Sequence, residues 1–139
     1  MKYVLDTDTL IYFMKGHQNV VEKISVISSS ELSTTIINQT ELLYGAYNSI
    51  RKEQNLKKIQ GFLKEIRVLE FSHKASFIFA EHKAHLKKQG NLVADMDLMI
   101  ASIVLANDGI LITNSTKHFE KIKVLKFENW GNSVPHLKK

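Results

Sequence analysis

One stretch decides the first strand, the first helix and the first candidate functional residues of the chain: Tyr3-Val4-Leu5-Asp6-Thr7-Asp8-Thr9-Leu10-Ile11. Residues 2–5 have the length and apolar character of a short buried strand, and Asp6 follows directly where that run ends. From Asp8 onward the apolar side chains recur at helical spacing, and Asp8 stands where a helix N-cap is expected. We therefore expect a strand at 2–5 and a helix over 8–15.

The same alternation of strand and helix patterns continues along the rest of the chain, with no internal repeat, linker or low-complexity tract. The patterns predict helices at 18–28, around 41–44, and at 52–66, 74–89 and 98–106, and strands at 32–35, 68–71, 110–112 and 124–127. Strands that alternate with helices indicate an α/β fold with a mostly parallel sheet. We expect residues 1–139 to form a single domain.

Composition excludes several classes of protein. The 139 residues include no cysteine, which rules out disulfides, thiolate zinc sites and cysteine nucleophiles. No stretch approaches the roughly 18 apolar residues of a membrane helix, and the start lacks the long apolar run of a secretory signal. We therefore predict a cytoplasmic protein that does not enter the membrane. The formal charge of +5 favours an encounter with phosphates or an acidic protein, although many lysine-rich proteins bind neither.

The aspartates are few and unevenly placed. The chain has only five, and four of them form two Asp-x-Asp pairs, Asp6 with Asp8 and Asp95 with Asp97. Asp6 follows the first predicted strand, Asp97 opens a strongly apolar helix, and Glu41 lies on the helix after the second strand. Ligand sites in parallel sheets form beyond the carboxyl ends of the strands. Asp6, Glu41 and Asp97 are therefore expected to approach one another at that edge.

Carboxylates gathered in one place repel each other unless a cation lies among them or some are protonated. A set of oxygen ligands without cysteine or histidine suits Mg²⁺ or Mn²⁺, which activate water and stabilise the charge of a phosphoryl transition state. Taken one at a time, these acids have simpler roles: Asp8 and Asp97 as helix N-caps, Glu41 as a surface residue, and Asp95 as a loop acid. Spacing alone leaves both interpretations open.

Five short segments carry a family resemblance, and they occur in family order across almost the whole chain. The segments are Tyr3–Tyr12, Thr40–Ala46, Asp97–Ser102, Leu111–Phe119 and Glu128–Trp130. Each is short, but five in register resemble the motifs of PIN-domain ribonucleases, and in particular of the VapC-type toxins of type II toxin–antitoxin systems.

The resemblance implies a three-layer α/β/α PIN fold and a Mg²⁺- or Mn²⁺-dependent endoribonuclease that hydrolyses phosphodiester bonds in structured RNA such as tRNA or rRNA. It also implies a homodimer that a cognate VapB-type antitoxin neutralises. Carried over by position, Asp6 and Asp97 would be the main metal ligands, and Glu41 would be a third acid that acts on the metal or on water.

One position departs from the family pattern. Where many relatives have Asn or Asp, this chain has Ser115, whose hydroxyl could position a water or a phosphate but adds no negative charge. We therefore include Ser115 among the candidate catalytic residues. Asp8, which stands at the usual Asn position, and Asp95, beside Asp97, could compensate for the missing charge.

Three other interpretations stay open. Asp6-Thr7-Asp8-Thr9 also resembles the start of haloacid-dehalogenase-type phosphatases, although Leu10 stands where that signature has Thr or Val. A phosphoreceiver module would require an acceptor aspartate after the third strand, and residues 42–94 contain none. The third alternative is a non-catalytic PIN fold that binds RNA or an antitoxin. The presence of acids at positions 6, 41 and 97 argues against this alternative.

Two remaining patterns have a functional and a simpler explanation. The apolar stripe of the fourth helix could bind a partner or pack in the core, and its members are Leu56, Ile59, Leu63 and Ile66. His82 and His85 have the spacing of a zinc pair, but surface histidines explain them more simply without a third ligand nearby.

Overall fold

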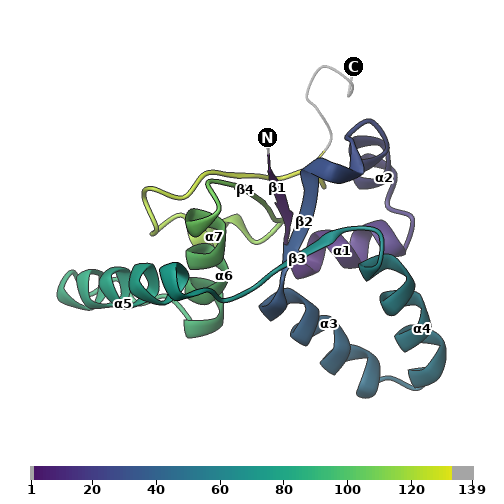
Figure 1. Ribbon diagram of the computed structural model, residues 1–139, viewed down its shortest axis with the longest axis horizontal. Helices are drawn as coiled ribbons and strands as arrows, with labels where there is room; N and C mark the ends of the chain where they lie inside the picture. The colour runs from purple at the N-terminus through teal and green to yellow at the C-terminus, as the bar shows by residue number, and fades with distance from the viewer. Residues whose placement is uncertain (1, 133–139) are drawn as a thin grey trace.

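Five short segments form a sheet at the centre of the fold, and every neighbouring pair of strands is parallel (Figure 1). In the computed structural model, which describes residues 2–132, the strand order is β3-β2-β1-β4-β5. The strands are β1 (Tyr3–Leu5), β2 (Leu32–Thr35), β3 (Arg67–Leu69), β4 (Ile110–Ile112) and β5 (Phe127–Glu128). The predicted α/β fold with a mostly parallel sheet is confirmed.

The helices form a layer on each side of this sheet (Figure 1). On one side lie α1 (Thr7–Met14), α2 (Gln18–Ser25), α3 (Ile36–Tyr47) and α4 (Lys52–Leu63), and on the other lie α5 (His73–Lys88), α6 (Asp95–Ala106) and α7 (Thr116–Phe119). The described residues thus form the three layers that the family resemblance implied. Residues 133–139, which belong to the predicted single domain 1–139, lie outside the described part.

Alternation along the central strands divides the core into two apolar clusters. Val4 of β1 and Leu111 of β4 face the layer of α5 and α6, whereas Leu5 and Ile112, one residue further, face α1 to α4. All four side chains are fully buried. Both faces of the sheet are therefore covered, as parallel sheets require.

The last strand was predicted at the wrong place. It was expected at 124–127, but β5 contains only Phe127 and Glu128. The Leu125 N–H donates to the Ile122 carbonyl at 3.1 Å, so this apolar stretch is a turn whose leucine packs into the core. Val124 is exposed. Apolar character here reflects burial of single side chains and not strand pairing.

Two helix ends also differ from the prediction. The helix expected at 18–28 ends at Ser25, whose hydroxyl donates to the Glu22 carbonyl at 2.7 Å and competes with the helix hydrogen bonds. The helix expected at 52–66 ends at Leu63. The short helix α7 was not predicted at all.

Neither aspartate that was assigned a possible capping role is an N-cap. The N-cap of α1 is Asp6, so Asp8 lies within the first turn and not before it. The N-cap of α6 is Ala94, which leaves Asp97 in the first turn of that helix. Both carboxylates are therefore available for contacts outside their own helix ends.

The apolar stripe of α4 packs in the core, as its simpler explanation predicted. Ile59 is buried, and the three others are partly buried against the same cluster: Leu56, Leu63 and Ile66. Within residues 2–132, no helix combines the length and apolar character that crossing a membrane demands.

The core analysis predicts that Ile103→Ala destabilises the protein by about 2–5 kcal/mol, because Ile103 is fully buried in the cluster between the sheet and α5. Urea unfolding measures this loss. The fully exposed Ile50 is the matched control, and Ile50→Ala should change the free energy of unfolding by less than about 0.5 kcal/mol. Equal losses for both variants would contradict this packing.

Candidate active site

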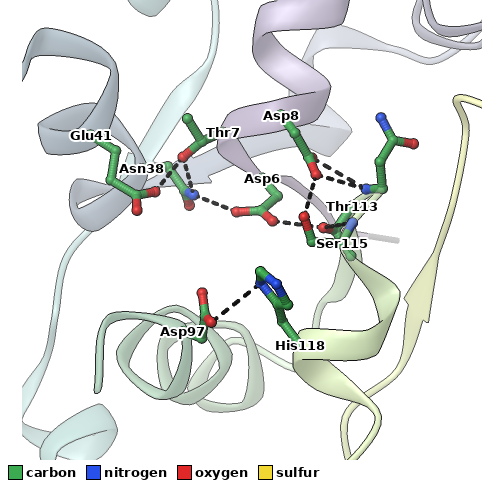
Figure 2. Close-up of polar contacts among 10 residues, drawn as sticks. Asp6, Thr7, Asp8, Asn38, Glu41, Asp97, Thr113, Ser115 and His118 are labelled. Atoms are coloured by element: carbon green, nitrogen blue, oxygen red, sulfur yellow. Dashed lines mark hydrogen bonds and ion pairs between the residues drawn. The ribbon is translucent and has the colours of Figure 1, made fainter. Parts of the chain in front are cut away.

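Asp6 lies at the carboxyl end of β1 with its side chain almost completely buried. The Thr113 hydroxyl donates to its Oδ2 at 2.7 Å, and the Asn38 amide donates to its Oδ1 at 2.7 Å (Figure 2). The Asp6 N–H donates to the Ile112 carbonyl at 2.8 Å and continues the pairing of β1 with β4. These side-chain donors are uncharged, so they orient the carboxylate without neutralising it.

Burial raises the pKa of Asp6 from 3.8 to about 6. The hydrogen bond from Thr113 lowers this pKa, the neighbouring Asp8 carboxylate raises it, and hydrogen bonds from Thr7 and Asn38 lower it. The ionised form of Asp6 is therefore held at a cost near neutral pH. A cation beside it would reduce that cost.

Glu41 lies on α3 and is tied to the same network (Figure 2). The Thr7 hydroxyl donates to Glu41 Oε1 at 2.5 Å and accepts from the Asn38 amide at 2.9 Å. Asn38 is fully buried and was not identified from the sequence. Its separation of three residues from Glu41, which brings two helical residues close together, was the available signal.

Asp8 holds the loop that follows β4. Its carboxylate accepts from the Ser115 hydroxyl at 2.8 Å and from the Asn114 N–H at 3.1 Å (Figure 2). The Ser115 N–H in turn donates to the Thr113 hydroxyl oxygen at 2.9 Å. The structure thus brings Asp8 together with Ser115, the candidate whose missing charge Asp8 was expected to replace.

Asp97 approaches the site from α6 and is partly buried. Burial raises its pKa, and His118 of α7, whose Nδ1 lies 3.5 Å from Asp97 Oδ2, lowers it. Figure 2 shows the Asp97 carboxylate on the side of the site opposite Asp8. Asp95 instead forms an exposed ion pair with Lys83 at 2.8 Å, so its carboxylate is engaged on α5 and not in this network.

The acids gather at one edge of the sheet but do not form a closed cage. Within the described range 2–132, no group of three or more His, Cys, Asp or Glu side chains is arranged to hold a metal ion. His82 and His85 therefore belong to no such group. Mg²⁺ usually keeps several waters and takes one or two carboxylates together with substrate phosphates. The oxygen-only donor set, with a buried carboxylate of raised pKa, fits that mode of binding.

Comparison with known proteins gives the family to which this fold belongs. Residues 3–125 match the family described as PIN domain. A ribonuclease VapC2 from Rickettsia felis is 34% identical over 134 residues, covering 94% of this chain and 98% of that protein. A tRNA(fMet)-specific endonuclease VapC from Shigella flexneri is 32% identical over 131 residues, covering 94% of this chain and 99% of that protein.

Solved structures support the same family. DNA-bound VapBC from Salmonella typhimurium superimposes with a TM-score of 0.87 at 30% identity, covering 94% of this chain and 98% of that one. The chain therefore belongs to the PIN-domain family and, within it, to the VapC-type ribonuclease toxins. This membership replaces the phosphatase and phosphoreceiver interpretations.

The raised pKa of Asp6 predicts how stability depends on pH in the protein without divalent cations. The folded state retains the Asp6 proton to higher pH than the unfolded state does, so this contribution is complete below about pH 4 and is lost as pH rises through about 6. Asp6→Asn cannot ionise and should be up to about 3 kcal/mol more stable than wild type at pH 8.

Urea unfolding in EDTA at pH 4 and pH 8 tests this, with the exposed Asp95→Asn as control. Asp95→Asn should show no gain that grows with pH. A variant Asp6→Asn that is no more stable than wild type at pH 8 would contradict the effect of burial on this carboxyl.

Proposed function

We propose that the ribonuclease reaction depends on Mg²⁺ or Mn²⁺ held by Asp6 and Asp97, with Glu41 as a third acid that joins the metal or orients the attacking water. The observation that carries this is the buried Asp6 carboxylate, which only uncharged side chains orient although burial raises its pKa to about 6. When bound, the cation supplies an activated water and stabilises charge on the phosphodiester.

The protein's own groups divide the work around that cation. Thr113 and Asn38 fix the two oxygens of Asp6, and Thr7 fixes one oxygen of Glu41. Ser115 contributes through its hydrogen bond to Asp8, which places a further carboxylate close enough to Asp6 to raise its pKa. Hydrolysis by an activated water needs no covalent intermediate on the enzyme.

We propose structured RNA as the substrate, with tRNA ahead of rRNA. The name of the Shigella flexneri relative, a tRNA(fMet)-specific endonuclease, supports tRNA. The formal charge of +5 supports a polyanionic substrate in general, because positive charge speeds the encounter with phosphates. Such a substrate places the reaction in the cytoplasm.

The first test is cleavage of total cellular RNA and of initiator tRNA by the purified protein with Mg²⁺, Mn²⁺ or EDTA. We expect discrete fragments that EDTA abolishes. Asp97→Asn should lower the cleavage rate by about 100-fold or more, because it removes a charge at the reacting centre. Asp95→Asn, two residues earlier in the same helix turn, should leave the rate unchanged within about 2-fold, since Asp95 pairs with Lys83.

Other outcomes identify the alternatives. Equal loss in both aspartate variants would indicate a general effect of charge on α6 and contradict the role of Asp97. A folded wild-type protein that cleaves no RNA with either metal, yet binds RNA or antitoxin, would be a non-catalytic PIN module.

We further propose that the chain forms a homodimer and binds a cognate VapB-type antitoxin. The solved relative from Salmonella typhimurium is a VapBC complex, which supports such a partner. A groove of about 320 Å³ between α1, α3 and α4 includes Glu41 in its lining, most of which is apolar, including Ile11, Met14 and Leu42. We assign this groove to the antitoxin.

The groove assignment predicts that Gly45→Leu weakens antitoxin binding. Gly45 lines the groove, and a side chain added there meets no atom within 4 Å, so the fold should tolerate leucine while the groove is filled. Gly61→Leu on α4 is the control, because Gly61 is equally open but is not among the groove residues. Co-expression with the antitoxin followed by affinity capture measures the difference, and sedimentation velocity measures the dimer. Equal retention of antitoxin by both variants would place its binding elsewhere.

A further inference from the structure

We infer that Asn38 is a positioning residue that sets the orientation of two acids of the site, Asp6 and Glu41, at the same time. This role rests on the proposed function, because the orientation of the two carboxylates matters to the reaction only if they act on the cation and the water. Asn38 itself need not touch the cation or the water.

All of the polar atoms of the Asn38 side chain are engaged (Figure 2). Its Nδ2 donates to Asp6 Oδ1 at 2.7 Å and to Thr7 Oγ1 at 2.9 Å, and its Oδ1 accepts from the Thr35 hydroxyl at 2.7 Å. A flipped amide would turn its oxygen toward the Asp6 carboxylate, which offers no proton when ionised. The network therefore determines which way the amide points.

The orientation of the Asn38 amide acts on Glu41 through the Thr7 hydroxyl. A hydroxyl has one proton to donate, and Thr7 Oγ1 already accepts from Asn38, so its own proton is directed to Glu41 Oε1. The hydrogen bonds thus run from Thr35 to Asn38, and then branch to Asp6 and, through Thr7, to Glu41. Each branch ends on a carboxylate.

The position of Asn38 on α3 argues against a purely structural role. The buried residues of this helix are Asn38, Leu42 and Ala46, which repeat every four residues as one core-facing stripe. An apolar residue at 38 would continue that stripe without the cost of burying an amide. The amide is thus explained by what its nitrogen binds, which is Asp6 directly and Glu41 through the Thr7 hydroxyl.

The two branches make separable predictions. Removing the Thr7 hydroxyl removes the hydrogen bond to Glu41 and leaves the one from Asn38 to Asp6, whereas removing the Asn38 amide removes the hydrogen bond to Asp6 and also the one that orients the Thr7 hydroxyl toward Glu41. Thr7→Val and Asn38→Leu keep roughly the volume of the native side chains. Thr34→Val is the matched control, because the fully buried Thr34 hydroxyl donates to the Leu5 carbonyl at 2.7 Å and reaches neither acid.

The experiment measures Mn²⁺ affinity without RNA, by calorimetry, and the single-turnover cleavage rate at saturating Mn²⁺ and RNA, using the full chain. We expect Asn38→Leu to weaken Mn²⁺ binding by about 10-fold or more and to slow cleavage by about 10- to 100-fold. Thr7→Val should slow cleavage by a similar factor with a smaller effect on Mn²⁺ affinity. Thr7→Ser, which keeps the hydroxyl, should restore the rate to within about 3-fold of wild type.

The control Thr34→Val should lose stability toward urea but keep both readouts. If it slows cleavage as much as Thr7→Val, or if folded Asn38→Leu keeps wild-type affinity and rate, the positioning role is overturned. If Asn38→Leu does not fold, the contrast of Thr7→Val with Thr7→Ser decides. A wild-type protein that neither binds Mn²⁺ nor cleaves RNA would overturn the proposed function itself, a result distinct from failure of the variants alone.

Discussion

The parallel pairing of β1 with β4 is the constraint on which the site depends. Leu5 pairs with Ile112, so the residues that follow, Asp6 and Thr113, leave the sheet side by side and join through a 2.7 Å hydrogen bond. The Thr9 hydroxyl reinforces this end of the pairing by donating to the Ile112 carbonyl at 3.0 Å. A slip of one residue would turn the apolar side chains of β1 to the wrong faces and separate Asp6 from Thr113.

That constraint creates a conflict between stability and chemistry. Val4 and Leu5, the two residues before Asp6, are fully buried, and the burial that extends to Asp6 makes the charge of its carboxylate costly and raises its pKa. Uncharged donors on opposite sides, Thr113 and Asn38, hold the carboxylate in one orientation but leave it able to bind a cation. The raised pKa and the fixed orientation are therefore two results of placing an acid at the end of a central strand.

Sequence patterns predicted the parts of this structure that burial dictates. Helical and strand periods located the elements, and the rule for parallel sheets brought Asp6, Glu41 and Asp97 to one edge. The polar residues that orient the acids could not be predicted, because Asn38 and Thr113 are ordinary in sequence and gain their role only from tertiary contacts. The position of the two-residue strand β5 was predicted wrongly for the same reason, because its pairing with β4 and not its own sequence pattern determines where it lies.

The pairing of Asp8 with Ser115 places the negative neighbour of Asp6 on α1 and not on the loop after β4. Ser115 adds no charge to that loop, but its hydroxyl donates at 2.8 Å to Asp8 in the first turn of α1. Because Coulomb effects depend on distance and not on which residue bears the charge, Asp8 raises the pKa of Asp6 from that position. The loop after β4 therefore acts on Asp6 in two ways, directly through the Thr113 hydroxyl and indirectly through the acid that Ser115 binds.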